Sequence, residues 1–247
     1  MEKGEVFGLI GPNGAGKSTT IRIVATLLSP SAGTVSVYDH DVTKEQAEIR
    51  KIISYLPEEA GAYENLSGEE YLTFMARFYS KEPQEMIRRG MAIADLGKRI
   101  KSHTKEYSKG MKRRLLIGRT LMTDAKLFIL DEPTSGLDVI HAHHIRKVIR
   151  DRMKDSGSTA LISSHNLLEV EFLCTRVAII NKGVIACSGT PDELKRKYGS
   201  SNLEEVFMTV VEGKGPETER TSSPAEAKRG NEKADPSATA AAGGEQA

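Results

Sequence analysis

The chain has 247 residues, with 35 lysines and arginines against 34 aspartates and glutamates, and a net charge of +1. This length allows a buried core, and the balanced charge disfavours a dedicated nucleic-acid-binding protein, so we expect no nucleic acid partner. No apolar run is long enough to cross a membrane, and the first residues lack the layout of a signal peptide. Cys174 and Cys187 show no spacing typical of a metal site, which favours buried or inert thiols.

Short β-rich apolar runs alternate with helical patterns along residues 1–211. This alternation is typical of an α/β fold with a mostly parallel sheet. The runs that we expect to be strands are Val6 to Ile10, Thr34 to Tyr38, Leu127 to Leu130, Thr159 to Ser163 and Val177 to Asn181.

A helical insert is predicted inside the sequence of this sheet. Ser67 and Glu70 have the spacing of a capping box, and a second helix is expected to start at Pro83 and stop before Gly97. We therefore expect one domain over residues 1–211, with a core of residues 1–58 and 108–211 and a helical subdomain of about 59–107. Residues 212–247 contain no Leu, Ile, Val, Phe, Met, Tyr or Trp, so we expect a disordered tail.

Residues 11 to 19 read GPNGAGKST and follow the apolar run VFGLI. They match the phosphate-binding loop G-x-x-x-x-G-K-[ST], in which glycines let backbone N–H groups and a helix N-terminus approach a polyphosphate. Lys17 is expected to reach the β and γ phosphates, and the Ser18 hydroxyl to bind Mg²⁺. The alternative is a glycine-rich turn that only caps a helix from Ser18 to Leu28.

Two carboxylates, Asp131 and Glu132, directly follow the apolar run Leu127 to Leu130. Ligands bind at the carboxyl ends of strands in open α/β sheets. We expect Asp131 to hold Mg²⁺, directly or through water, and Glu132 to polarise the water that attacks the γ phosphate. The alternative is a solvated acidic turn.

Four segments taken together resemble the ATP-binding subunit of an ABC transporter: GPNGAGKST, YSKGMKRRL at 107 to 115, LFILDEPTSGLD at 127 to 138 and ISSH at 162 to 165. The resemblance covers roughly residues 4 to 207. The YSKGM variant and the segment SNLEEVF resemble exporters of the drug-resistance and sodium-extrusion type.

The resemblance implies a P-loop NTPase (RecA-like) fold and a site for ATP and Mg²⁺. The phosphate-binding residues would be Gly11, Pro12, Asn13, Gly14, Ala15, Gly16, Lys17, Ser18 and Thr19. Ser108 and Gly110 match the signature that caps the γ phosphate of ATP bound to a second ATPase subunit, and Asp138 matches the loop that contacts that subunit. His165 matches the switch histidine at the γ phosphate, so the catalytic set is Lys17, Glu132 and His165.

The implied activity is ATP hydrolysis that drives a separate integral-membrane permease, with the chain peripheral on the cytoplasmic side of the membrane. The segment from Ala60 to Leu66 is the expected docking surface for the permease. Alternatives are a truncated regulatory subunit and a soluble ABC ATPase of translation or DNA repair. The chain length and the short insert fit neither an ABC ATPase of translation nor one of DNA repair.

The sequence departs from the family pattern at several positions. Lys109 and Met111 replace the usual Gly and Gln of the signature, and Glu58 stands where the family has a Gln near Mg²⁺. The ten residues before Gly11 hold no aromatic suited to stack on adenine, because Phe7 is expected in the core. This predicts weaker and less adenine-selective nucleotide binding.

Three further patterns have simple structural interpretations. His141, His143 and His144 could be a metal site, although their spacing favours another role. The basic run Lys112, Arg113 and Arg114 is expected to be a solvated helix start, with phosphate attraction as the alternative. Tyr71, Phe74, Met75 and Phe78 repeat at helical spacing and predict a core stripe of the insert.

Overall fold

The computed structural model describes residues 1–79 and 83–213, so the predicted tail lies outside the described residues except at Glu212 and Gly213. Its main sheet has six strands in the order β4-β5-β6-β1-β7-β8. All neighbouring pairs are parallel except the last, β7 with β8. The strands are β1 (Val6–Ile10), β4 (Ile53–Leu56), β5 (Leu127–Asp131), β6 (Thr159–Ser163), β7 (Arg176–Asn181) and β8 (Val184–Gly189). The expected α/β fold is confirmed.

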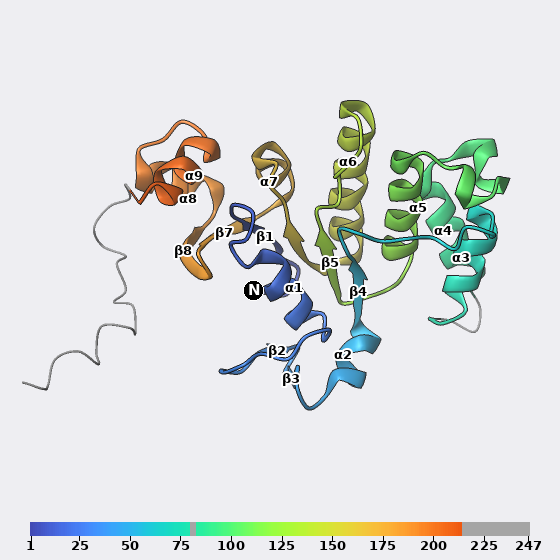
Figure 1. The fold of residues 1–247 in the computed structure, drawn as a ribbon, viewed down its shortest axis with the longest axis horizontal. Helices are drawn as coiled ribbons and strands as arrows, with labels where there is room; N and C mark the ends of the chain where they lie inside the picture. The colour runs from blue at the N-terminus through green and yellow to red at the C-terminus, as the bar shows by residue number, and fades with distance from the viewer. Residues whose placement is uncertain (80–82, 214–247) are drawn as a thin grey trace, which may run out of the picture. The chain divides into compact units, whose positions relative to one another are not determined.

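Helices cover both faces of this sheet (Figure 1). In β5, Phe128 and Leu130 join one core cluster, whereas Leu127 and Ile129 join the other, as the two-residue period of a strand requires. The first cluster packs against α5 (Lys109–Leu121), α6 (Val139–Ser156), α7 (Leu167–Leu173), α8 (Pro191–Tyr198) and α9 (Leu203–Val211). The second packs against α1 (Lys17–Val24) and α2 (Gln46–Ile52).

The helical insert lies between β4 and α5 in the chain. It consists of α3 (Gly68–Ala76), α4 (Gln84–Ala94) and the short 3₁₀ helices η1 (Gly97–Lys101) and η2 (Thr104–Glu106). The capping box is confirmed, because Glu70 N–H donates to Ser67 Oγ at 3.2 Å and Ser67 N–H donates to Glu70 Oε2 at 2.8 Å. The second helix begins directly after Pro83, as expected.

Two element boundaries differ from the sequence prediction. The predicted strand Thr34 to Tyr38 shrinks to β2 (Ser36–Val37), which pairs only with β3 (His40–Asp41) in a separate small sheet. The chain turns at Tyr38 and Asp39, which both have positive φ. Helix α1 ends at Val24 rather than Leu28, because Thr26 takes a left-handed φ of 61° and Leu27 N–H donates back to the carbonyl of Arg22.

Two strands of the main sheet escaped prediction. The run of β4 directly follows helix α2 with no turn residue between them, and β8 mixes apolar with exposed positions at the edge of the sheet.

The expected aromatic core stripe is wrong for two of its members. Tyr71 is buried and Met75 packs against the core, but Phe74 is 40% and Phe78 69% exposed. Phe78 lies beyond the end of α3, so the helical period no longer directs it inward. In the described ranges 1–79 and 83–213, no helix combines the length and apolarity that a membrane span needs.

Candidate functional site

A cavity of about 410 Å³ opens where β1 and β5 end. Strands β1, β6 and β5 are neighbours in the sheet, so the segments that follow them meet at one edge. Most of the residues predicted for nucleotide binding and hydrolysis line this cavity: Asn13, Gly14, Gly16, Lys17, Ser18, Thr19, Glu58, Asp131, Glu132 and His165.

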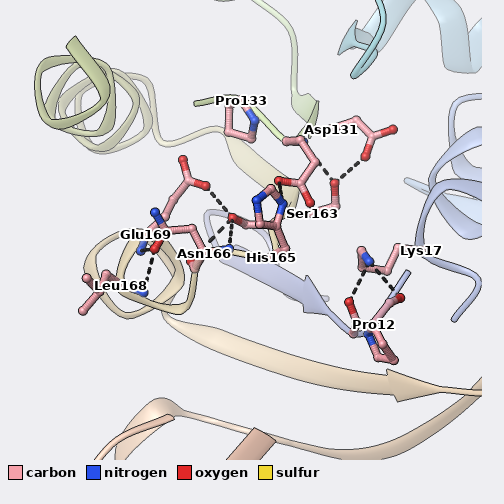
Figure 2. Close-up of polar contacts among 12 residues, drawn as sticks. Pro12, Lys17, Asp131, Pro133, Ser163, His165, Asn166, Leu168 and Glu169 are labelled. Carbon is pink, nitrogen blue, oxygen red and sulfur yellow. Dashed lines mark hydrogen bonds and ion pairs between the residues drawn. The ribbon is translucent and has the colours of Figure 1, made fainter. Parts of the chain in front are cut away.

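The phosphate-binding loop depends on two glycines for its path. A Cβ at Gly11 would lie 2.3 Å from the carbonyl oxygen of Ile180, so only glycine fits there. Gly16 has a φ of +107° and immediately precedes α1, whose first N–H groups have no side-chain cap. The side chain of Lys17 is anchored in this loop, because Nζ donates to the carbonyls of Gly11 at 2.7 Å and Pro12 at 3.2 Å (Figure 2). The loop therefore presents free N–H donors and a positioned cation to an anionic ligand.

The two carboxylates at the end of β5 are fixed by β6. Ser163 Oγ donates to Asp131 Oδ1, and Glu132 N–H lies 3.1 Å from both the Oγ and the carbonyl oxygen of Ser163. Glu132 has a positive φ of 49°. Its Oε2 lies 2.7 Å from His165 Nδ1, so the predicted base and the switch histidine are paired. Glu132 is buried, whereas His165 is two-thirds exposed and can reach a ligand in the cavity.

The donor set suits a hard divalent cation completed by a ligand's phosphates. Mg²⁺ is commonly bound by one or two carboxylates together with phosphate oxygens and water. The hydroxyl of Ser18 and the carboxylates of Asp131 and Glu58 line the same cavity. Within the described residues, no group of three or more His, Cys, Asp or Glu side chains could hold a metal.

Ser108 and Gly110, which match the family signature at the start of α5, do not line this cavity. Ser108 caps α5, with Met111 N–H donating to its Oγ at 3.2 Å, and Gly110 lies close to Leu137 and Gly136. Asp138 caps α6 in turn. Its carboxylate accepts from His141 N–H at 3.0 Å and lies 2.6 Å from His141 Nδ1. These contacts lower the pKa of Asp138 and give His141 a structural role. The structure therefore does not bring Ser108, Gly110 and Asp138 to the phosphate loop of the same chain.

The expectation of a solvated basic run is wrong for Arg113, which is buried. Its guanidinium is only 5% exposed and donates to five backbone carbonyls at 2.6–3.0 Å, those of Pro57, Glu58, Asp131, Glu132 and Pro133. Burial lowers its pKa. A sequence signal for this existed, because Arg113 is followed at i+3, i+4 and i+7 by Leu116, Ile117 and Thr120, which are all buried.

Glu169 is a second polar residue that sequence reasoning missed. It is fully buried on α7, where its Oε2 accepts from Ser164 Oγ at 2.5 Å. Desolvation raises the pKa of its carboxyl group. Its neighbours Val170 and Leu173 are also buried, so the pattern of α7 already placed position 169 near the inward face.

The comparisons with known proteins agree with this geometry. A family profile described as ABC transporter matches residues 1–135. The linearmycin resistance ATP-binding protein LnrL of Bacillus subtilis is 35% identical over 85% of this chain and 71% of its own length. The daunorubicin/doxorubicin resistance ATP-binding protein DrrA of Streptomyces peucetius is 40% identical over 81% of this chain, which spans only 61% of DrrA.

A solved structure extends the likeness to three dimensions. It is described as the ATP-binding subunit of an ABC transporter, is 32% identical, and superposes with a TM-score of 0.76 over 84% of this chain and 88% of its own. The residues matched by the family profile include the phosphate loop, strand β5 with Asp131, and Glu132 directly after it. The chain belongs to the ABC transporter family, as an ATP-binding ATPase subunit.

Proposed function

We propose that the chain binds ATP with Mg²⁺ in the cavity at the ends of β1 and β5 and hydrolyses it to drive a membrane permease. Lys17 and the N-terminus of α1 bind the phosphates, while Ser18 and Asp131 hold Mg²⁺ with Glu58 beside them. Glu132 polarises the attacking water, and His165, whose Nδ1 lies 2.7 Å from Glu132 Oε2, contacts the γ phosphate. The observation that carries this proposal is the convergence of these side chains on one cavity.

The position of the signature supports a head-to-tail pair of ATPase subunits. Ser108 and Gly110 lie outside the nucleotide cavity of their own chain, so they can cap only a nucleotide that another subunit binds. Val139 and Ile140, which follow Asp138, are 82% and 80% exposed. Exposed aliphatic side chains beside this loop suit burial against a second subunit, either another copy or a related chain.

The permease would dock beside Ala60 to Leu66. A cavity of about 640 Å³ lies there, lined by Glu58, Glu59, Ala60, Gly61, Tyr107, Lys109, Lys112, Arg113, Leu116 and Ser135. Tyr63, Phe74 and Phe78 extend the apolar surface nearby, with ring centroids 5.6 and 5.2 Å apart in edge-to-face pairs. Arg113 donates to the backbone carbonyls of both Glu58 and Glu132, so a shift of the docking segment that also moved Glu58 would reach the backbone of Glu132.

LnrL and DrrA are named for resistance to linearmycin and to daunorubicin/doxorubicin, which favours export as the direction of transport. Because the permease selects the cargo, the ATPase subunit itself need not contact it. The chain would lie on the cytoplasmic face of the membrane, held there by the permease.

The decisive experiment is Glu132→Gln in the full chain. The amide keeps the shape of the side chain but cannot take a proton from water, so we expect hydrolysis to fall by about 100-fold or more while ATP still binds. Phosphate release and fluorescent ATP titration measure the two quantities separately. Wild-type turnover in this variant would contradict the role of Glu132, and absence of ATP hydrolysis by the wild-type chain would contradict the proposed function as a whole.

A further inference from the structure

Glu169 is a buried acid with an incomplete set of hydrogen bonds. It is 1% exposed, and its Oε1 has no hydrogen-bond partner among the described residues. Its Oε2 accepts from Ser164 Oγ at 2.5 Å. Burial of an unpaired charge is costly, so desolvation raises the pKa of Glu169 and favours the neutral acid.

The partner of Glu169 belongs to the segment that carries one member of the proposed catalytic pair. Ser164 directly precedes His165. The pair itself is joined by the 2.7 Å contact between Glu132 Oε2 and His165 Nδ1. Glu169 is therefore connected to this pair through Ser164, and Figure 2 shows Glu169 beside the segment of His165 and Asn166.

The first turn of α7 keeps this link in place. Asn166 Oδ1 accepts from the N–H groups of Leu168 and Glu169 at 3.1 and 3.3 Å, and Asn166 N–H donates to Ser164 Oγ at 3.0 Å. The segment that carries His165 is therefore tied to the helix on both sides of the histidine.

We propose that Glu169 is a positioning residue that, through its hydrogen bond with Ser164, holds His165 beside Glu132 for ATP hydrolysis. This role rests on the functions proposed above for those two residues. Glu169 does not line the nucleotide cavity, so it acts only through Ser164.

Two substitutions and one control test the proposal in the full chain. Glu169→Met has a similar length but makes no hydrogen bonds, so we expect kcat to fall roughly tenfold with KM for ATP within about twofold. Glu169→Gln keeps a side chain of the same shape whose oxygen can accept from Ser164 Oγ, so kcat should stay within about threefold of wild type. Glu171→Met, on the same helix but paired with Lys195, is the matched control and should behave as wild type.

The possible outcomes distinguish a failure of the role proposed for Glu169 from a failure of the proposed ATPase function. Wild-type kcat in a folded Glu169→Met chain, or equal losses in the Met and Gln variants, would overturn the role of Glu169 while leaving the ATPase intact. If Glu169→Met does not fold, Glu169→Gln decides, and a kcat reduced tenfold in that variant counts against the proposal. Failure of the proposed function shows instead as a wild-type chain that does not hydrolyse ATP.

Discussion

The N-termini of α1 and α5 use the same physical device in two different surroundings. Each helix begins beside glycine and offers backbone N–H groups to a ligand. The start of α1 faces Lys17, Asp131 and Glu132 of its own chain in one cavity. The start of α5 is capped by Ser108, and neither Ser108 nor Gly110 lines that cavity. The first helix start therefore lies among most of the predicted nucleotide-binding residues, whereas the second, on the proposal above, would cap a nucleotide that another subunit binds.

The largest expected effect comes from blocking the second helix start. Ser108→Arg places a bulky cation where the opposing γ phosphate would lie, so ATP hydrolysis should fall by about 100-fold. Binding of ATP to the isolated chain should not change, because Ser108 is outside that cavity. Equilibrium titration alongside a turnover assay checks both. Loss of ATP binding would break the division between the two helix starts.

A smaller effect is expected at the first helix start. Lys17→Ala removes a charge-assisted contact to phosphate, so ATP affinity should fall by roughly 10- to 100-fold. Titration with a fluorescent ATP analogue measures this change, and circular dichroism shows whether the fold is kept. Unchanged affinity would mean that the loop binds its ligand without the lysine.

Arg113 connects the two regions, because it lies on α5 and donates to the backbone carbonyls of Asp131 and Glu132 at the end of β5. Arg113→Met leaves buried carbonyls without partners and should lower the free energy of unfolding by about 3 kcal/mol. Arg114→Met is the matched control, since Arg114 donates to a single carbonyl, that of Asp95 at 2.7 Å, and should cost about 1 kcal/mol. Urea denaturation measures the free energy of unfolding of both variants. Equal losses would show that the five hydrogen bonds of Arg113 stabilise the fold no more than the single bond of Arg114.

The smallest expected effect is a pH dependence of stability due to Glu169. Because its pKa is raised in the folded state, the native chain binds more protons than the unfolded chain above the ordinary glutamate pKa of about 4.3. The contribution of Glu169 to the free energy of unfolding is therefore fully present below that pH. It is lost as the pH rises through the pKa of Glu169 in the folded state. Glu169→Gln has no carboxyl group to ionise, so it does not lose this contribution. The free energy of unfolding of the variant should therefore rise relative to that of the wild type as the pH rises. Parallel curves in urea denaturation would exclude this contribution.

Local sequence could predict the phosphate loop and the acidic strand end, because each is a continuous segment with a distinct residue pattern. His165 was placed by its resemblance to a family motif, and the structure brings it to Glu132. Arg113 was missed, since its partners are backbone carbonyls at least 18 residues away in the sequence. Glu169 was missed because its partner Ser164, only five residues away, is a hydroxyl that belongs to no recognised motif. The exposed Phe74 and Phe78 failed for a related reason: apolar spacing shows which face of a helix can pack, but not whether a neighbour covers it.

The backbone of Glu132 has a cost for the fold. A non-glycine residue in the left-handed region, here at a φ of 49°, loses about 1–2 kcal/mol relative to an ordinary conformation. Glycine would relieve this strain but remove the carboxylate. The most stable variant at this position is therefore expected to be an inactive one, so selection for thermal robustness alone would drive this enzyme towards losing its chemistry.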